Sequence, residues 1–167
     1  MLNIEEIYKE LSPPIFRYLY RLTGSSQEAE ELTQETFYRM LKSIYRFRQD
    51  ASLTTWLYKI AFNTYQEWKR KKGIYCFRYG FDLSDFRGEQ TEDPVLQLEK
   101  KENVSLIKEA LFMLSEMQRV TLILRDLEGL SYQQISEITG KSLAWVKVTL
   151  FRARANFREI YSRLGEG

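Results

Sequence analysis

The fold of the C-terminal half is decided by the stretch Gly129-Leu-Ser-Tyr-Gln-Gln-Ile-Ser-Glu-Ile-Thr-Gly-Lys-Ser-Leu-Ala-Trp-Val-Lys-Val-Thr-Leu-Phe-Arg-Ala-Arg-Ala-Asn-Phe-Arg158, which predicts two helices joined by a tight turn. Ser131 is a natural N-cap for the first helix, and Gln134 follows at the three-residue spacing of a capping box. Gly140 can adopt the left-handed backbone conformation that ends a helix. Ser142 can cap the second helix, so the pattern predicts a helix-turn-helix unit.

The second of these helices has one apolar face and one basic face. Val146, Leu150, Ala153 and Phe157 follow at spacings of four, three and four residues, which places them on the side that faces the core. An apolar anchor beneath a cationic surface suits the major groove of duplex DNA. A solvated basic helix in any helical bundle is the alternative interpretation. The residues that point away from the core are Lys147, Phe151, Arg152, Arg154 and Arg158.

Composition narrows the class of protein. The chain has 167 residues, of which 44% are hydrophobic, and it can therefore build one domain or two small ones. No apolar run approaches the roughly 18 residues of a membrane span, and the N-terminus lacks the basic and apolar regions of a signal peptide. We therefore expect a cytoplasmic protein that does not insert into a membrane.

The residues that most enzymes use are missing or rare. The chain has no histidine, and its single cysteine, Cys76, excludes an internal disulfide and a cysteine-based zinc site. The sequence contains no glycine-rich phosphate loop, nucleophile elbow or Asp-rich metal motif. We therefore expect a protein that is not an enzyme and that binds neither a metal nor a cofactor.

Charge is unevenly distributed along the chain, although the net charge is only +2. Residues 141–163 carry six cations and one anion, whereas residues 73–98 carry five acidic and two basic residues. The cations therefore gather in the two helical parts, with an acidic stretch between them.

The N-terminal part predicts three helices. The first covers residues 3–23, with a kink or a break at Pro13-Pro14, and the second runs from a cap at Ser25 or Ser26 to about Ile44. A third begins near Thr54 or Thr55 and reaches Lys72. On the second helix the predicted inward residues are Ala29, Leu32, Thr36, Met40 and Leu41. The predicted outward residues are Gln34, Glu35 and Arg39.

The third helix carries aromatic residues on two faces. Its predicted core face holds Trp56, Leu57, Ile60, Ala61, Thr64 and Trp68. Its predicted outer face holds Tyr58, Lys59, Phe62, Asn63, Tyr65 and Lys69. Exposed rings interleaved with cations can stack bases and hold the phosphates of single-stranded nucleic acid. Packing of these rings against the first helix or a neighbouring domain explains them equally well.

Residues 73–94 show no helical periodicity and contain three glycines and a proline. A connection of about 22 residues is too long for an ordinary loop inside one compact domain. Two further helices, over 95–114 and 115–127, are predicted ahead of the helix-turn-helix unit. The sequence thus predicts an all-α protein with two small helical domains, residues 1–72 and 95–167, joined by a flexible acidic and aromatic linker.

Three segments together resemble one family. They are Glu28-Ala-Glu-Glu-Leu-Thr-Gln-Glu-Thr-Phe37, Phe47-Arg-Gln-Asp-Ala-Ser-Leu-Thr-Thr-Trp-Leu-Tyr-Lys-Ile-Ala-Phe-Asn63, and Leu124-Arg-Asp-Leu-Glu-Gly-Leu-Ser-Tyr-Gln-Gln-Ile-Ser136 with the later Val146-Lys and Phe151-Arg-Ala-Arg154. In this order they resemble the AEDLxQExF motif, the T-W-L-Y-R-I-A-x-N motif and the C-terminal DNA-binding domain of extracytoplasmic-function (group 4) sigma factors of bacterial RNA polymerase. The resemblance spans nearly the whole chain.

The resemblance implies a role for each domain. A sigma-2-type N-terminal domain would contact polymerase core through Glu31, Gln34, Glu35 and Phe37. The same domain would bind the single-stranded −10 element and hold a flipped base through residues that include Phe47, Arg48, Gln49, Asp50, Ser52, Tyr58, Lys59, Phe62 and Asn63. A sigma-4-type C-terminal domain would read the −35 element through Ser142, Trp145, Lys147, Val148, Thr149, Phe151, Arg152, Arg154 and Arg158.

The partners that the resemblance implies are core RNA polymerase, promoter DNA and an anti-sigma factor. Core polymerase would be held through the clamp helices of its largest subunit and the flap of its second subunit. The anti-sigma factor is often anchored in a membrane in this family. The acidic linker matches the segment that threads toward the RNA exit path.

The chain departs from the family pattern at the start of the recognition helix. Many members have Gly-Thr-Val-Lys-Ser-Arg there, whereas this chain has Ala144-Trp-Val-Lys-Val-Thr149. Apolar groups at these positions favour contact with thymine methyl groups over hydrogen bonds to guanine. Phe62 replaces the common arginine beside Asn63, which removes one candidate phosphate contact.

Two other functions fit part of the sequence. A freestanding helix-turn-helix regulator would have no need of the aromatic and basic third helix. A protein-interaction module, such as an anti-sigma antagonist, would leave Arg152, Arg154 and Arg158 without a role.

Overall fold

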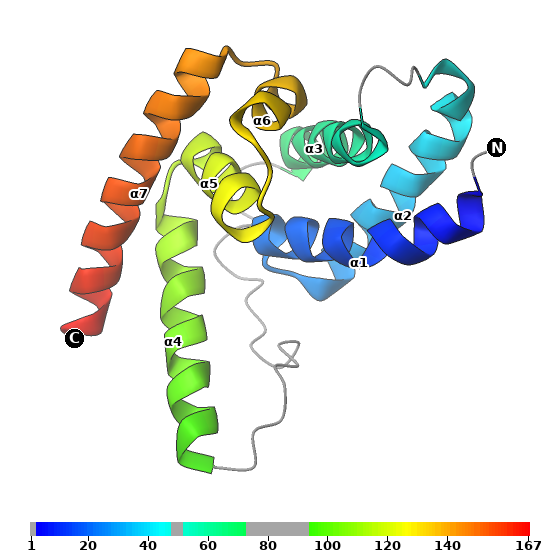
Figure 1. Ribbon diagram of the computed structural model, residues 1–167. Coiled ribbons are helices and arrows are strands. Elements are labelled where there is room, and N and C mark those ends of the chain that lie inside the picture. Colours follow the sequence, from blue (N-terminus) through cyan, green and yellow to red (C-terminus); the bar gives the residue numbers. More distant parts are fainter. Residues whose placement is uncertain (1–2, 48–51, 73–93) are drawn as a thin grey trace.

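The computed structural model describes residues 3–47, 52–72 and 94–167, with side chains in the fourth helix described from Glu102 onward (Figure 1). The N-terminal elements are α1 (Ile4–Thr23), α2 (Ser26–Ser43), the short 3-10 turn η1 (Ile44–Arg46) and α3 (Leu53–Lys72). The C-terminal elements are α4 (Pro94–Met113), α5 (Glu116–Leu122), the π-helical turn η4 (Ile123–Leu127), α6 (Tyr132–Thr139) and α7 (Leu143–Gly165). Every regular element in these ranges is helical, which confirms the predicted fold class.

Side-chain caps fix the helix-turn-helix unit as the sequence predicts. The Ser131 hydroxyl accepts the Gln134 N–H at 3.1 Å, and the Gln134 side chain accepts the Ser131 N–H at 2.9 Å, which completes the capping box. Gly140 ends α6 with φ at 72°. The Ser142 hydroxyl accepts the Trp145 N–H at 3.1 Å and begins α7. Each such cap stabilises its helix by about 1 kcal/mol.

Two predicted helices differ from the structure in their continuity. α1 is one helix through Pro13 and Pro14, so of the two predicted alternatives, a kink or a break, the break is wrong. Proline has no backbone N–H, so the carbonyls of Lys9 and Glu10 have no helical donor. Both of these residues are exposed, so water can hydrogen-bond to the two carbonyls. The predicted helix over 115–127 instead changes to π geometry at η4, where the Glu128 N–H bonds to the Ile123 carbonyl at 2.9 Å.

The first three helices pack into a small bundle around fully buried residues from α1, α2 and α3, which include Ile15, Leu19, Met40, Leu57 and Ala61. Arg39 of α2 joins the bundle at its surface, because it bonds to Glu35 on its own helix at 2.9 Å and to Glu67 of α3 at 2.7 Å. One inward prediction is wrong, since Leu41 is 46% exposed. Helical spacing places it at the edge of the buried face of α2.

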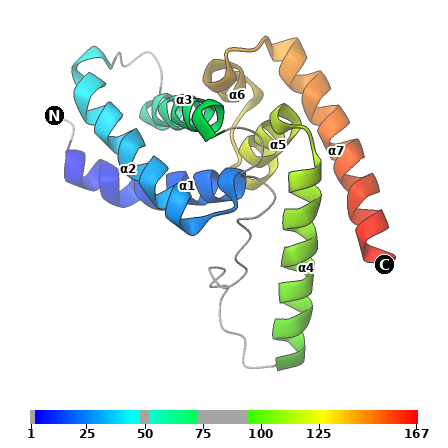
Figure 2. The same cartoon turned by 180° about the vertical axis from the view of Figure 1, so that it is seen from behind.

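The C-terminal helices extend the same hydrophobic core with buried residues of their own. α7 packs against α4, α5 and α6, and it lies at the outer edge of the molecule in both views (Figures 1 and 2). Its contribution to this core consists of Val146, Leu150 and Ala153, with Phe157 half-buried, as the spacing of these residues predicts. One face of α7 is therefore left toward solvent.

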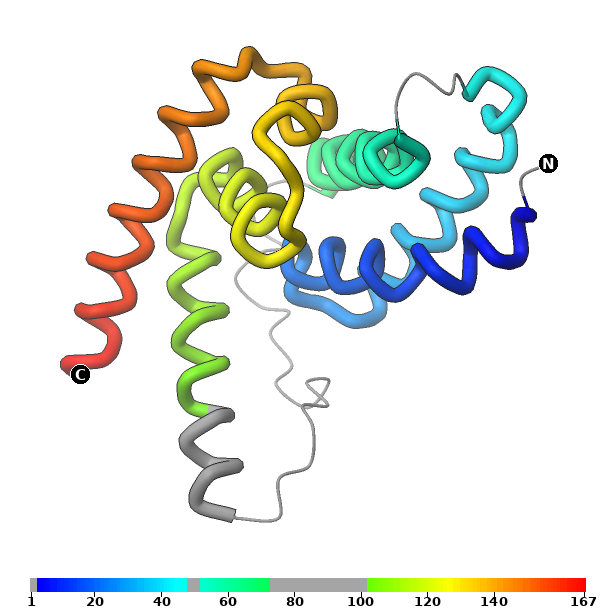
Figure 3. Tube along the Cα trace, viewed as in Figure 1, coloured from blue at the N-terminus to red at the C-terminus, as the bar shows by residue number. Residues whose placement is uncertain are grey.

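The two groups of helices are in direct contact. α6 packs across α3, so that α3 lies between α2 and α6, and η4 reaches α1 (Figure 3). We call this packing of the C-terminal helices against the N-terminal helices the closed arrangement. It determines which of the predicted site residues are accessible.

Candidate polymerase and nucleic-acid interface

The outer face of α7 presents several of the residues predicted for the −35 element. Val148 is 47% exposed and Phe151 is 73% exposed. Lys147, Arg152 and Arg158 are also exposed, and they flank the two apolar side chains. Arg152 forms no ion pair with any residue in the described part of the chain. This face therefore combines free positive charge with accessible apolar groups.

Other residues predicted for the −35 element are engaged within the protein. Arg154 makes a two-pronged contact with Asp126, with its Nε at 2.9 Å and its Nη2 at 2.5 Å from the carboxylate oxygens. Hydrogen bonding to Asp126 raises the pKa of the Arg154 guanidinium. The Ser142 hydroxyl is used as the N-cap, and Trp145 is half-buried beneath Lys141, whose Nζ lies 5.5 Å from the ring centroid. Thr149 is half-buried on the flank of α7.

A narrow strip remains accessible on α3. Ser52, Lys59 and Asn63 are exposed, and the spacing of seven and four residues places them on one face. Phe47 packs on Trp56 of the same face, with ring centroids 5.0 Å apart. Ser52 also caps α3 through the Thr55 N–H at 3.1 Å. Arg48, Gln49 and Asp50 lie outside the described residues.

Trp56 is a residue of this strip that the sequence analysis assigned to the core. It packs against the core as predicted but is only half-buried, and its ring also lies beside Phe47. Helical spacing could have indicated this position, because Trp56 lies four residues from Ser52 and three from Lys59.

Tyr58 and Phe62 do not form the exposed platform that the outer face of α3 predicted. They are 3% and 7% exposed, and Tyr65 of the same face is fully buried. Tyr58 packs edge-on against Tyr18 of α1 at 5.4 Å. Phe62 lies on the same face of α3 as Thr55 and Gln66. These two residues bond to Gln134 of α6 and to Glu116 of α5, so this face of α3 is turned toward the C-terminal helices. Packing against the first helix and the C-terminal half, which the sequence left open as the alternative, is therefore what the structure adopts.

Glu128 is the main polar link between the two halves. Its carboxylate, with the side chain only 4% exposed, accepts a hydrogen bond from Arg21 of α1 at 2.7 Å and another from the Tyr58 hydroxyl of α3 at 2.9 Å. Burial, and next the negative charge of Glu128, raise the pKa of Tyr58 above its usual value. A buried carboxylate is stable only with such partners, so these three residues depend on the closed arrangement.

Further contacts extend the link along α3 and α1. Glu116 at the start of α5 accepts a hydrogen bond from Gln66 at 3.0 Å and pairs with Lys69. At the other end, Gln134 of α6 donates to Thr55 at 3.1 Å. Lys108 of α4 donates to the Tyr20 hydroxyl at 2.9 Å.

The polymerase-binding residues predicted on α2 are only partly accessible. Glu31 and Gln34 are exposed, and Glu35 is half-exposed but bonded to Arg39. Phe37 is 5% exposed and packs edge-on against Tyr8 at 4.9 Å, so its predicted outward position is wrong. The ring completes the contact between α1 and α2, and this packing outweighs exposure to solvent. The accessible part of the predicted surface is acidic and amide in character.

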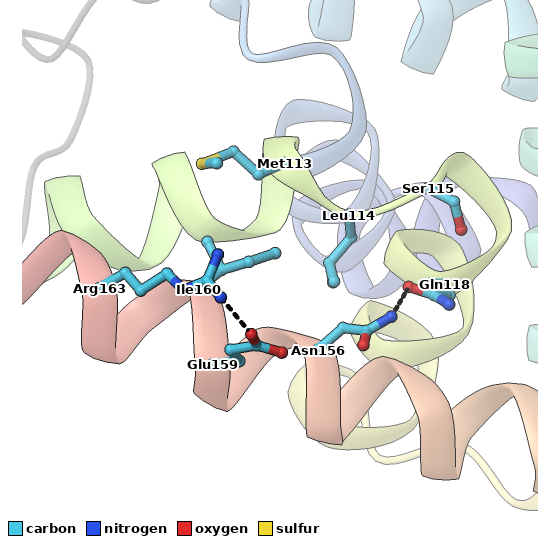
Figure 4. Close-up of a pocket in the computed structure, with 8 residues that line it drawn as sticks. All are labelled: Met113, Leu114, Ser115, Gln118, Asn156, Glu159, Ile160 and Arg163. Carbon is cyan, nitrogen blue, oxygen red and sulfur yellow. Dashed lines mark hydrogen bonds and ion pairs between the residues drawn. The ribbon is translucent and has the colours of Figure 1, made fainter.

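A shallow groove lies between the end of α4, the start of α5 and the C-terminal half of α7 (Figure 4). Met113, Leu114 and Ile160 line it, and a hydrogen bond from Asn156 to Gln118 at 3.1 Å crosses one side (Figure 4). In the described part of the chain, no group of three or more acidic or cysteine side chains is placed to hold a metal ion. No described helix is both long and apolar enough to cross a bilayer.

A helix-turn-helix unit with an exposed basic face defines the class of DNA-binding proteins. Comparison with known proteins identifies the family. Residues 7–74 match sigma-70 region 2, and residues 105–157 match sigma-70 region 4. The RNA polymerase sigma factor YlaC of Bacillus subtilis (strain 168) is 34% identical over 160 residues, which cover 94% of this chain and 91% of that protein.

Two solved structures have a similar fold over nearly the whole chain. The sigma factor RpoE, in complex with the anti-sigma factor NepR from Bartonella quintana, gives a TM-score of 0.77 at 22% identity, with 95% of this chain and 96% of that chain covered. CnrH, in complex with the cytosolic domain of CnrY, gives a TM-score of 0.71 at 16% identity, with 96% and 88% covered.

The chain belongs to the extracytoplasmic-function group of the sigma-70 family. Its function is that of a sigma factor in the initiation of transcription.

Proposed function

We propose that this sigma factor binds its three targets through three separate accessible surfaces. The exposed face of α2 binds core RNA polymerase, the strip on α3 binds the single-stranded −10 element, and the outer face of α7 binds the −35 duplex. The limits 1–72 and 95–167 for the two functional domains are part of this proposal. The observation that carries it is the presence of two separate candidate DNA-binding surfaces, on α3 and α7, in one sigma-family chain.

On α2 the proposed polymerase contacts are Glu31 and Gln34, with Glu35 contributing through its pair with Arg39. An acidic and amide surface fits a basic partner surface, such as clamp helices of the largest polymerase subunit, because complementary charge speeds encounter and fixes orientation. The flap of the second subunit is the proposed contact of the C-terminal domain.

The proposed −10 surface is used in two stages. Lys59, Asn63 and Ser52 are accessible in the closed arrangement and can contact the backbone and an extruded base. Phe62 becomes available for stacking only when α6 moves away from α3, and Tyr58 must lose its bond to Glu128 and also its contact with Tyr18 of α1. Separation of the two halves is therefore part of the proposed function.

An anti-sigma factor is the proposed regulatory partner. The support for it is that the RpoE chain of similar fold was solved in complex with the anti-sigma factor NepR, and its likeness extends over 95% of this chain, which includes both helical groups. We propose that such a partner binds the closed form and keeps the α3 surface covered.

The proposal is tested by transcription in vitro with core polymerase, core polymerase plus this chain, and this chain alone. We expect promoter-specific transcripts only from the combination. Glu31→Lys should weaken binding to core polymerase, whereas Glu137→Lys, at an exposed position of α6, serves as the matched control. A chain that binds duplex promoter tightly without core polymerase and leaves core transcription unchanged would support the freestanding regulator instead.

A further inference from the structure

The solvent face of α7 carries a continuous apolar stripe. It consists of Ala144, Val148, Phe151 and Ala155, and all four residues are exposed. Their spacing of four, three and four residues places them in one line along the helix, on the side opposite Val146, Leu150 and Ala153. α7 is therefore apolar on two opposite faces, of which only the inner one is explained by the core.

Exposure of the stripe is substantial where the side chains are large. Phe151 is 73% exposed and Val148 is 47% exposed, and Phe151 is among the most exposed large hydrophobic residues of the described chain. The stripe runs for about 16 Å along α7, since each helical residue adds 1.5 Å. An apolar line of this length on a helix that lies at the outer edge of the molecule requires a partner.

The flanking charges identify the chemistry of that partner. Lys147 and Arg158 lie on one side of the stripe and Arg152 lies on the other, and all three are exposed. Phosphates border both sides of a DNA major groove, and the 5-methyl group of thymine is the apolar feature on its floor. The small side chains at the two ends of the stripe allow the helix to approach the bases closely.

A second copy of the chain fits this face less well. Pairing two stripes would bring Lys147, Arg152 and Arg158 of both copies together, with repulsion between like charges. A single line of four residues, two of them alanine, also buries far less than the roughly 1,200 Å² of a stable protein interface.

We infer that Val148 and Phe151 read thymine methyl groups in the major groove of the −35 element, with Lys147, Arg152 and Arg158 holding the phosphates on either side. The inference rests on the proposed function and adds the sequence feature that α7 selects. It assigns no contact with thymine methyl groups to Trp145 and Thr149, because both lie half-buried on the flank of the helix.

Holoenzyme assembled from core polymerase and the full chain tests this inference in two steps. First, promoter templates randomised in the −35 region are selected by the holoenzyme and sequenced, and we expect thymine at adjacent positions of the selected element. Second, each selected thymine is replaced by deoxyuridine, which keeps the hydrogen-bonding atoms and removes only the methyl group. Binding should fall roughly fourfold for each contacted methyl, as expected for one buried methyl group. Deoxyuridine placed in the spacer should have no effect.

Variants connect the methyl groups to the two side chains. In Phe151→Ala and Val148→Ala holoenzymes, the affected thymine positions should bind equally well as thymine or as deoxyuridine. Both side chains are exposed, so the variants should melt at the wild-type temperature, which circular dichroism checks. A merely structural role of either residue would lower binding to both templates and leave the ratio between them at its wild-type value, which would overturn the inference.

The remaining outcomes are distinguishable. A selected −35 element without thymine preference, or equal binding to thymine and deoxyuridine templates, overturns the inference and leaves the proposed function standing. Selection of no −35 element at all overturns both. Concentration-dependent dimers that Phe151→Ala dissociates in sedimentation experiments would assign the stripe to a second copy of the chain and overturn the inference as well.

Discussion

Arg152 and Arg154 lie two residues apart on α7, yet their surroundings differ. Arg152 is exposed, and within the described residues it has no acidic partner. Arg154 is held by Asp126 through two hydrogen bonds, so its guanidinium is largely occupied. Positive charge near DNA is useful only where it is not already neutralised by a carboxylate. The proposed function therefore assigns DNA binding to Arg152 only, whereas Arg154 links α7 to η4 through Asp126.

Replacement of these two arginines by alanine should separate the two functions. Arg152→Ala should weaken −35-dependent binding by the holoenzyme and lower the slope of log affinity against log salt by about 1, because one phosphate contact is lost. Arg154→Ala should change the salt slope less. It should lower the stability of the C-terminal helices by less than about 1 kcal/mol, since the pair with Asp126 is partly exposed.

Asp126→Asn is the matched control for the second variant. It removes the ion pair but keeps Arg154, and it should therefore lower stability while raising affinity for DNA. Equal salt slopes for Arg152→Ala and Arg154→Ala would show that the two arginines are equivalent, contrary to this assignment.

At the scale of the element, the turn between α6 and α7 sets the angle at which α7 is presented. Gly140 has φ at 72°, where an L-residue is strained, and a Cβ built there meets no other atom within 4 Å. The requirement for glycine is therefore a backbone requirement and not a matter of space. Ser142 then begins α7 immediately after the turn.

Gly140→Ala should therefore cost about 1 kcal/mol of stability through backbone strain alone. Gly165→Ala is the matched control, because Gly165 lies at the end of α7 without positive φ and also has open space around it. That variant should be neutral or slightly stabilising. Thermal or denaturant unfolding measures both, and equal stability of the two variants would contradict the role given to the turn.

At the scale of the whole molecule, a few polar contacts centred on Glu128 link the two halves, in addition to the hydrophobic core that they share. Its carboxylate is buried between Arg21 and Tyr58, so truncation leaves two donors without an acceptor. Pairs at Glu116, Gln134 and Lys108 support the same closure from other helices. These contacts lie beside a hydrophobic core that runs through both halves, and the proposed function requires the halves to separate when polymerase or DNA binds the covered surfaces.

Glu128→Ala should weaken closure on the order of 2 kcal/mol, because hydrogen bonds to a charged group are lost. We expect a larger radius of gyration in small-angle X-ray scattering and faster binding of single-stranded −10 DNA by the holoenzyme. Glu137→Ala, at an exposed position of α6, should leave both measurements unchanged. An unchanged radius of gyration for Glu128→Ala would show that the other contacts suffice for closure.

High pH should also weaken the closed arrangement through Tyr58. Its pKa is raised in the folded chain, by burial first and by Glu128 next, while Arg17 and Arg21 oppose the shift. A group with a raised pKa contributes its full stabilisation below the ordinary value, here 10.0, and loses it as the pH rises further. Scattering experiments should therefore show opening only above about pH 10. Tyr58→Phe, which cannot ionise, should show a smaller change over the same range.

The sequence by itself determined the local structure of this protein. Ser131, Gly140 and Ser142 specify caps and a turn that need only neighbouring backbone atoms, and the spacing of Val146, Leu150 and Ala153 specifies the inner face of α7 in any helical context. The family motifs in order along the chain indicated the function for the same reason, since they depend on residue type and spacing alone.

Only the tertiary structure decided which predicted site residues are accessible. Tyr58 and Phe62 have the spacing of an exposed platform, but both are buried, because Tyr58 packs against Tyr18 of α1 and bonds to Glu128, and α6 packs across α3. Arg154 looks like Arg152 in the sequence, and only the fold brings Asp126 to it from 28 residues away. Exposure and ion pairing depend on contacts between distant segments, and helical periodicity contains no information about the second surface that will cover a helix.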